Sequence, residues 1–412
     1  MKQIYSISLS LLLILFFFSV GFCQDNYMYL KKGKVNIRYT NAVVWKFKNK
    51  ISAQKRRSFL NNLPLEIANA GDFNLSSLDE KYHSINAKSS DLADKMSNTL
   101  SQDTSVQFAN KFIISDQKDT IGLTNEVFIK LRPGSNIKEH MAYLKSLGLM
   151  EIEQDSLDLD AYILTFPANT ILKTANTLHE SKKFEFADGN FLLPIKNNVQ
   201  ARTSVIPLYL RPLNNSFTEI KHPFGGFLTS VNDPYFRGNA WYAGPIGLQN
   251  AWDYSTGQGI IVAVIDNGVT QSHPDIINNL AANKGYDALG YYPDGRCVYG
   301  PNDIHGSECA GIVAETGNNS MGSAGIAYNS KVISIRFASG KGVNLFGYYF
   351  NLITPSVFYN SIVFARTNAD IITLSWGVSS TFDAQDAALK NAATAGGRSG
   401  KGMPIFASAG NV

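Results

Sequence analysis

Residues 259–268 read GIIVAVIDNG, and this stretch decides the fold class. An unbroken apolar run ends at Asp266, and Gly268 then lets the chain turn. A strand that is buried on both faces, as in a parallel sheet, shows such a continuous run. Functional groups gather at the carboxyl ends of strands in open α/β sheets. Asp266 is therefore a candidate site residue, although an aspartate here is also typical of a turn or a helix N-cap.

Further apolar segments follow at residues 331–335, 371–374 and 404–407, and helical stretches separate them. This alternation predicts a parallel sheet whose two faces are covered by helices, and we assign it to residues 223–412. A nucleotide-binding domain would need a Gly-rich turn after its first strand, but residues 266–271 contain one glycine. That alternative for the α/β domain is therefore weak.

Residues 125–194 show a different order of elements. Strands and helices are expected there in the order β-α-β-β-α-β, at residues 126–131, 137–147, 152–154, 161–166, 170–181 and 184–187. This order predicts a compact α+β domain with a four-stranded antiparallel sheet and two helices on one face. Residues 195–222, which contain Pro207 and Pro212 among polar residues, are expected to be a linker.

Residues 24–124 are polar and weakly patterned. A hairpin is expected between residues 27–30 and 35–37, and a helix at residues 53–61. Residues 89–107 are rich in Ser and Asp and show little apolar periodicity.

The N-terminus has the pattern of a secretory signal. Lys2 precedes an apolar run over residues 7–22, and the small residues Gly21 and Cys23 suit a signal peptidase. Residues 1–23 are therefore expected to be cleaved, and the protein to be secreted without a stable membrane anchor. A retained anchor is the alternative, but the run is short for the roughly 20 residues that span a bilayer. A lipid anchor on Cys23 is another, and bulky Phe22 argues against it.

The composition excludes some classes of protein. With 412 residues, 44% hydrophobic and 17% charged, the chain is long enough for two or three globular domains. The net charge of +4 and the lack of a dense Lys/Arg stripe argue against a nucleic-acid partner. After signal cleavage, Cys297 and Cys309 remain, and the sequence does not determine whether they pair.

Three other positions are suited to chemistry. His305 begins an expected helix that has small residues at Gly306 and Ala310. Residues 375–377 follow an expected strand, and a backbone edge there can pair with an extended peptide. Asn411 follows the last expected strand, and its amide can donate a hydrogen bond to a developing oxyanion. Taken alone, His305 also fits a surface histidine, residues 375–377 fit the end of a strand, and Asn411 fits a turn.

The ordered set is more specific than its parts. Asp266-Asn-Gly268, His305-Gly306, Ser375-Trp-Gly377 and Ala409-Gly-Asn411 together resemble the subtilisin/kexin (subtilase, S8) family of serine endopeptidases. The resemblance covers about residues 232–412 and implies a three-layer αβα fold that acts on polypeptide substrates. It implies that His305 is the general base, that Asp266 orients it and that Asn411 is the oxyanion donor. It places the substrate cleft at Ser375, Trp376, Gly377, Ala409 and Gly410.

The family's nucleophile is a serine in a Gly-Thr-Ser element further along the chain. No Gly-Thr-Ser occurs in the 412 residues, so we expect residues 223–412 to be a truncated catalytic domain. The parent protein is expected to be a peptidase and this chain alone to be inactive. The alternative function is a non-catalytic, protease-like binding or inhibitory module.

The resemblance also implies a metal site and an intramolecular partner. His273-Pro-Asp275 and residues 317–323 resemble the family's structural calcium loop. The ligands would be the side chains of Asp275 and Asn319 and the backbone carbonyls of Gly317, Met321 and Ser323, an all-oxygen set that suits calcium. A plain turn is the alternative.

Residues 125–194 resemble the family's propeptide, which assists folding and inhibits the enzyme, and residues 24–124 would belong to the same prosegment. Arg202 and Arg211 are candidate cleavage sites in the linker. The side chain preferred at substrate cleavage sites stays open.

Overall fold

The computed structural model describes most of the chain from residue 26 onward. The described residues are 26–48, 51–52, 54–55, 58–59, 62, 82–196, 231–290, 304–338, 343–345, 348–378 and 380–409. The expected signal, most of the expected helix at 53–61, the linker from residue 197 with Arg202 and Arg211, and Cys297, Gly410 and Asn411 lie outside these residues.

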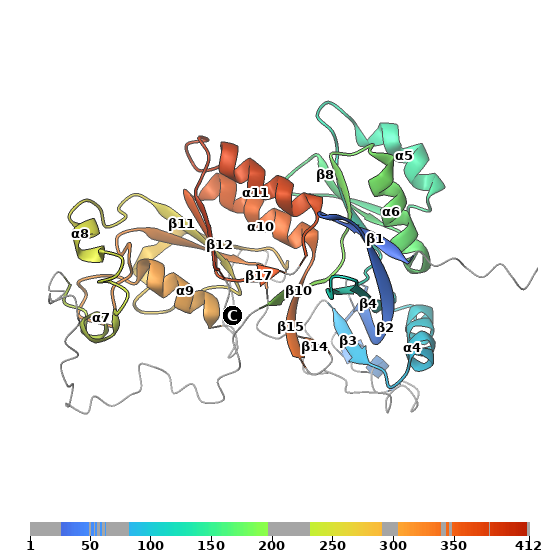
Figure 1. Cartoon of the computed structure of the whole chain (residues 1–412), viewed down its shortest axis with the longest axis horizontal. Coiled ribbons are helices and arrows are strands. Elements are labelled where there is room, and N and C mark those ends of the chain that lie inside the picture. The colour runs from blue at the N-terminus through green and yellow to red at the C-terminus, as the bar shows by residue number, and fades with distance from the viewer. Residues whose placement is uncertain are drawn as a thin grey trace, which may run out of the picture.

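The C-terminal half contains the predicted parallel sheet (Figure 1). Its strands, in spatial order, are β12 (Leu280–Asp287), β13 (Lys331–Arg336), β11 (Ile261–Asp266), β16 (Ile371–Leu374) and β18 (Ile405–Ala407). All neighbours are parallel. Strand β12 was not predicted, because Asn283, Lys284 and Gly285 interrupt its apolar pattern and its pairing with β13 shifts register there.

Helices cover both faces of this sheet, as predicted. Helix α9 (His305–Ala314) packs on one face, where Val264 shares a buried cluster with Ala310. Helices α10 (Pro355–Asn368) and α11 (Asp383–Ala395) belong to the core on the other face, with Ile265. The domain is thus a three-layer α/β fold. Short helices α7 (Pro234–Asn239), α8 (Leu248–Trp252) and η4 (Ile277–Asn279) complete it.

The predicted β-α-β-β-α-β order is present between residues 126 and 189, and we call this part the antiparallel domain. Its elements are β6 (Glu126–Lys130), α5 (Ile137–Ser146), β7 (Glu151–Gln154), β8 (Ala161–Thr165), η2 (Ala168–Thr170), α6 (Ile171–Ser181) and β9 (Phe186–Gly189). The strands form an antiparallel sheet in the order β7-β8-β6-β9. Leu144 of α5 and Leu178 of α6 are buried in the core that they share with Phe128 of β6.

The described part of residues 26–123 is also folded, and we call it the N-terminal module. It contains β1 (Tyr27–Leu30), β2 (Gly33–Phe47), β3 (His83–Asn86), α4 (Ser90–Gln102), β4 (Val106–Ser115) and β5 (Thr120–Gly122). The hairpin of β1 and β2 was predicted. Helix α4 was missed: Ser89 caps it, and Ala93, Met96 and Leu100 at helical spacing are buried.

A fourth sheet crosses between these parts. Strand β10 (Leu193–Lys196) lies between β15 (Tyr348–Ile353) and β17 (Gly377–Val378) and is antiparallel to both. Strand β14 (Val343–Leu345) completes the order β14-β15-β10-β17. The expected linker therefore begins too early at residue 195, since Ile195 and Lys196 belong to β10. Partners more than 150 positions away in sequence decide this strand, and local composition does not show them.

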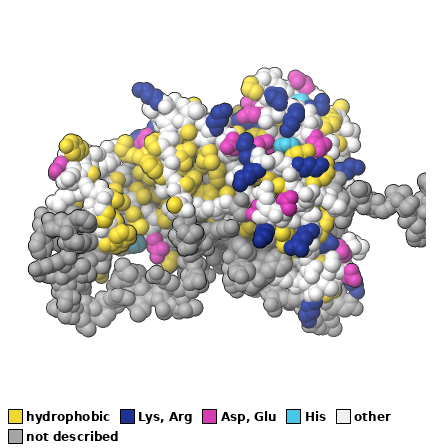
Figure 2. Space-filling view, viewed as in Figure 1, with side chains coloured by type: hydrophobic (Ala, Val, Ile, Leu, Met, Phe, Trp, Pro, Cys, Tyr) yellow, Lys and Arg dark blue, Asp and Glu magenta, His cyan; other side chains and the backbone are white. Residues whose placement is uncertain are grey.

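Charge is unevenly distributed over the molecule. Figure 2 shows acidic and basic side chains gathered over the N-terminal module and the antiparallel domain, whereas a broad apolar area lies over the parallel-sheet part. Large apolar residues that are exposed in the latter part include Trp241, Ile312 and Phe406. On the face that Figure 2 shows, the charged side chains thus lie mainly over the N-terminal module and the antiparallel domain.

A buried ion pair joins β2 to the antiparallel domain. Lys46 Nζ lies 3.0 Å from Glu126 Oε1, and the two side chains are only 6% and 8% exposed. We expect Glu126→Ala to lower the free energy of unfolding by about 3–5 kcal/mol, because Lys46 would remain charged and buried without its partner. Urea unfolding followed by fluorescence measures this. Joint replacement of Lys46 by Met and Glu126 by Leu is the control and should recover most of the loss. A change below about 0.5 kcal/mol in Glu126→Ala would contradict the prediction.

Candidate active site

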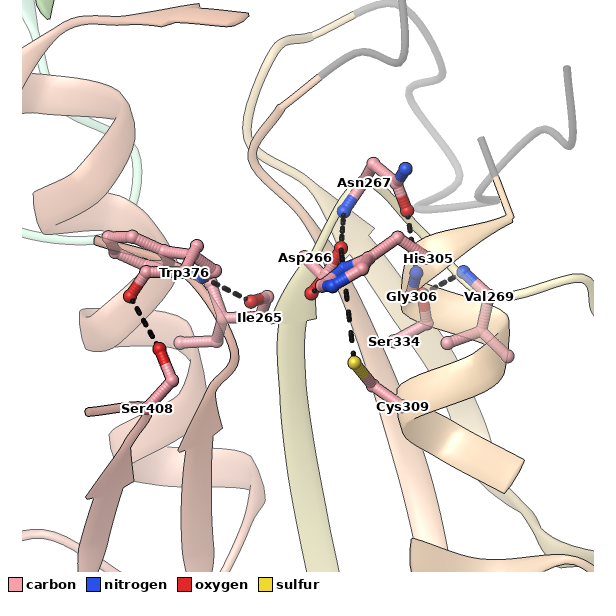
Figure 3. Close-up of polar contacts among 10 residues, drawn as sticks. All are labelled: Ile265, Asp266, Asn267, Val269, His305, Gly306, Cys309, Ser334, Trp376 and Ser408. Atoms are coloured by element: carbon pink, nitrogen blue, oxygen red, sulfur yellow. Dashed lines mark hydrogen bonds and ion pairs between the residues drawn. The ribbon is translucent and has the colours of Figure 1, made fainter. Parts of the chain in front are cut away.

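Asp266 ends β11 in the middle of the parallel sheet, between β13 and β16 (Figure 3). Its side chain is buried, and Oδ1 accepts a hydrogen bond from Asn267 N–H at 2.7 Å. A carboxylate in this position has lost most of its water and needs polar partners. The strand thus presents a fixed negative charge at the carboxyl edge of the sheet.

The turn after β11 holds the start of α9, where His305 lies. Gly306 N–H donates to Asn267 Oδ1 at 2.8 Å. A Cβ on Gly306 would lie 2.2 Å from Gly268 O, so a larger residue would push the helix away. Ser307 Oγ accepts from Thr270 N–H at 2.9 Å. These contacts fix His305 against Asp266.

His305 and Asp266 form the hydrogen-bonded pair that the sequence predicts. Nδ1 of His305 lies 2.9 Å from both carboxylate oxygens of Asp266. The histidine side chain is 24% exposed and the aspartate side chain 4%, so one face of the pair is open to solvent. The hydrogen bond to Asp266 raises the pKa of His305 above its ordinary value, with a smaller contribution from Cys309, and burial opposes the rise. Donation through Nδ1 leaves the Nε2 lone pair of the neutral ring available as a base.

Cys309 is a member of this site that the sequence analysis missed. Its Sγ lies 3.8 Å from His305 Nδ1, one helical turn further along α9. The sequence suggested only a possible pairing with Cys297, which lies outside the described residues. In the described part of the chain Cys309 is a free thiol. The four-residue spacing from His305 on an expected helix was the available signal.

Residues 375–377 lie beside the pair, because Trp376 is anchored to β11. Its Nε1–H donates to Ile265 O at 2.7 Å, one residue before Asp266. The indole packs against Phe337, with ring centroids 4.3 Å apart. Ser408 Oγ–H donates to Trp376 O at 3.4 Å, which joins the end of β18 to this segment. Ala409 follows and is exposed.

The edge formed by Gly377 and Val378 is paired with the protein's own chain. Lys196 of β10 lies opposite Gly377, and Ile195 lies opposite Val378. On its other side, β10 pairs with β15, with Ile195 opposite Asn351. An extended segment of the chain thus lies between two edges, beside the place where the sequence predicts peptide binding.

The predicted calcium residues Asp275, Asn319 and Ser323 are close together. Asn319 Nδ2 donates to Asp275 Oδ1 at 2.6 Å, and Ser323 N–H donates to Asp275 Oδ2 at 3.1 Å. Met321 N–H donates to Asn319 Oδ1 at 2.9 Å. A Cβ on Gly322, which has φ +53°, would lie 2.0 Å from Asp275 Oδ2. The loop that begins at Gly317 therefore wraps around the Asp275 carboxylate.

Two further carboxylates at this loop were not predicted. Asp233 is buried and accepts from Asn318 N–H at 2.7 Å and from Asn319 N–H at 3.2 Å. Burial, followed by the charges of Asp275 and Asp233, raises the pKa of Glu315 to about 7. Burial also raises the pKa of Asp275, as does the charge of Asp233. Oxygen donors with unbalanced negative charge suit a hard cation.

Comparison with known proteins bears on the same part of the chain. Residues 257–412 match the Peptidase_S8 family model, described as the subtilase family. This part of the chain is similar to the subtilase family, and we call residues 257–412 the subtilase part. The subtilase part contains Asp266, His305 and residues 375–377, all of which the structure brings together at one edge of the sheet.

Similarity to individual subtilases covers a minor share of them. Proprotein convertase subtilisin/kexin type 4 of Mus musculus is 31% identical over 158 residues, which are 36% of this chain and 22% of that protein. Furin-1 of Xenopus laevis is 30% identical over 157 residues, which are 36% of this chain and 18% of that protein. Among solved structures, fervidolysin from Fervidobacterium pennivorans matches with 18% identity and a TM-score of 0.46, covering 70% of this chain and 40% of that one. The chain thus spans about a fifth of the length of these curated relatives.

Proposed function

We propose that the protein is a serine endopeptidase in which His305 is the general base and Asp266 orients it. The observation that carries this proposal is the contact of His305 Nδ1 with both Asp266 oxygens at 2.9 Å, at the carboxyl end of β11. His305 accepts the proton of the attacking hydroxyl through Nε2 and returns it to the leaving amine. Asp266 stays ionised, keeps the ring in the productive tautomer and stabilises the imidazolium.

The described residues supply the base and its orienting carboxylate. Within that part of the chain, the His305 ring contacts Asp266 and Cys309, and neither is a serine. The nucleophile in this proposal is the serine of the subtilase family. Asn411, which lies outside the described residues, is proposed as the oxyanion donor.

The proposed substrates are polypeptides bound as extended strands. Support comes from β10, which pairs through its backbone with Gly377 on one side and with β15 on the other. Pairing of this kind depends on the main chain and therefore tolerates varied side chains. Because β10 follows directly on the antiparallel domain, we propose that residues 125–196 act as an inhibitory propeptide. A substrate would have to displace β10 to pair with Gly377 and Val378.

A proteolysis assay tests this function. A form of the protein that carries the family's serine is incubated with an unfolded protein substrate, with and without a serine-directed phosphonate. Hydrolysis that the phosphonate abolishes, with covalent labelling of the enzyme, is the expected result. No hydrolysis by a folded, propeptide-free enzyme would overturn the proposal.

We also propose that the loop of residues 317–323 binds calcium. Asp275 and Asn319 would hold the ion through side-chain oxygens, and Gly317, Met321 and Ser323 through backbone carbonyls. Asp233, which is buried, and Glu315, which is partly buried, are further carboxylates near these donors. Bound calcium would stabilise the loop and would not act on the substrate.

Calcium is therefore expected to stabilise the fold. At about 100 times its Kd, an ion that binds only the folded state adds about 2.7 kcal/mol, which raises the melting temperature by several degrees. Asp275→Ala should abolish this calcium-dependent rise, as measured by thermal unfolding with calcium or with chelator. Asp253→Ala, which removes an exposed carboxylate of the same part, is the matched control and should keep it. A calcium response that persists in Asp275→Ala would contradict the site.

We propose a location outside the cytoplasm, on the basis of the signal-like residues 1–23. The helices that the structure describes include none with the length and apolarity required to cross a bilayer.

A further inference from the structure

The N-terminal module contacts the subtilase part at the first turn of α11. Lys31, in the β1–β2 turn, has its Nζ 3.2 Å from Asp383 Oδ1 and 3.0 Å from Asp386 Oδ2. Its backbone N–H donates to Thr381 O at 2.8 Å. The antiparallel domain contacts the same turn, where Asp188 Oδ2 accepts from Ala384 N–H at 2.7 Å. The turn of one hairpin therefore meets the negatively charged start of a helix that belongs to the subtilase part.

A second contact lies at the β4–β5 turn of the module. Asp119 accepts a hydrogen bond from Ser380 Oγ–H, and the two residues are only 6% and 7% exposed. A buried carboxylate that lost this donor would carry an uncompensated desolvation cost. The contact is thus worth more than the half-exposed ion pairs of Lys31. Ser380 lies two positions beyond Val378, which pairs with β10.

Strand β5, which follows the β4–β5 turn, contacts the residue that precedes β10. Gly122 N–H donates to Leu192 O at 2.9 Å, and Leu192 N–H donates to Gly122 O at 2.8 Å. Leu192 directly precedes β10. Residues 119–122 therefore contact the subtilase part through Asp119, just before β5, and the chain leading into β10 through Gly122, the last residue of β5.

Apolar packing makes these contacts one continuous structure. Met28 and Leu30 of β1 are buried in the same cluster as Ile195 of β10 and Trp376 of the candidate site. Asn176 Nδ2 of α6 donates to Tyr27 O at 2.9 Å, which also joins the hairpin to the antiparallel domain. The hairpin is thus buried against the rest of the molecule.

We propose that the N-terminal module is a clamp whose binding partner is residues 380–386 of the same chain, and that this clamp holds β10 between β15 and β17. That the clamp inhibits a peptidase rests on the function proposed above. The clamp itself does not depend on that function. The module contacts both residues 380–386 and Leu192. Once one of these contacts has formed, the module is held near the other, so the individually weak contacts stabilise each other. Release of β10 then requires the module to detach from residues 380–386 as well as the loss of the strand pairing.

Amide hydrogen exchange of the full chain tests the clamp, read out in peptides that cover residues 192–196. We expect Asp119→Ala to speed exchange there by about tenfold, which corresponds to about 1.4 kcal/mol, because the buried hydrogen bond to Ser380 is lost. Ser380→Ala removes the same bond from the other side without altering the module and should have a similar effect. Lys31→Ala is expected to speed exchange by only about two- to fivefold, because its ion pairs are exposed.

Matched controls exist within the module. Asp116→Ala removes a carboxylate of the β4–β5 turn that accepts hydrogen bonds from Asn36 N–H and Nδ2, within the module. Lys34→Ala removes a lysine of the β1–β2 hairpin whose Nζ lies over the Tyr27 ring, also within the module. Both controls should leave exchange at residues 192–196 unchanged.

Two results would overturn the clamp. One is unchanged exchange at residues 192–196 in both Asp119→Ala and Ser380→Ala. The other is faster exchange in the two controls to the same extent as in these variants. Asp119→Ala could loosen the module itself, which would show as faster exchange at the amides of β4. In that case the test of the clamp rests on Ser380→Ala and on Lys31→Ala, which alters an exposed side chain. Hydrogen exchange needs no peptidase activity, so this result stands apart from any failure of the proposed function.

Discussion

Replacing His305 by alanine is expected to lower the kcat/KM of the serine-bearing enzyme by about four to six orders of magnitude. Without the imidazole that Asp266 orients, the attacking hydroxyl loses the group that accepts its proton. Hydrolysis of a short fluorogenic peptide by propeptide-free enzyme measures the change. Substrate binding through Gly377 and β15 should persist, so the loss is expected in kcat more than in KM.

Asp253→Ala is the matched control for this variant. Asp253 is exposed and lies after the proposed propeptide, so it is retained in the propeptide-free enzyme. The control variant should cleave the peptide like the unchanged enzyme. Equal activity of His305→Ala and the unchanged enzyme would refute the assignment of the general base.

Replacing Asp266 by asparagine is expected to lower kcat by about four orders of magnitude. An amide can donate to Nδ1 and so favour the tautomer that carries its proton on Nε2, which is the wrong atom for a base. The variant also loses the charge that raises the pKa of His305. The acid limb of the pH–rate profile should therefore move to lower pH while the plateau falls, because His305 must be neutral to act.

The same pair affects stability with a definite sign. Folding raises the pKa of His305, so the charged pair stabilises the fold below the unfolded-state pKa. This contribution is lost as the pH rises through the raised value. NMR titration of the His305 ring, in the full chain and in Asp266→Asn, measures both shifts. Asp253→Asn, at an exposed site, is the control, and an unaltered His305 titration in Asp266→Asn would contradict this account.

The sequence predicted the parts of the fold that have a strong local signal. Strand β11 follows from its unbroken apolar run, because a strand covered on both faces has no polar side to show. The antiparallel domain was predicted because its short strand-like segments are separated by two segments with apolar residues at helical spacing. Asp266 and His305 were predicted together because the order of short motifs resembles one family, although each residue alone fits an ordinary turn.

The sequence did not predict features that depend on contacts between distant parts. Strand β10 exists because β15 and β17 provide partners, and residues 195–196 alone read as a linker. In the N-terminal module, residues 42–47 of β2 are all buried, so this part of the strand shows no regular apolar–polar alternation. Asp233 was not predicted, because its position beside Asn319 depends on the tertiary fold. Cys309 was read as a disulfide candidate, and its contact with His305 depends on α9 starting at residue 305.

The strand order of the parallel sheet has a consequence for how the protein folds. Strand β11 pairs with β13 and β16, which lie far from it in the chain, and each pairing requires closure of a long loop. The antiparallel domain instead completes its sheet within residues 126–189, and the hairpin of β1 and β2 is more local still. We therefore expect the N-terminal parts to acquire structure first. They then offer Asp188 as a preformed contact for the start of α11, which lowers the entropic barrier to assembling the slower sheet, and β10 forms as it pairs with β17.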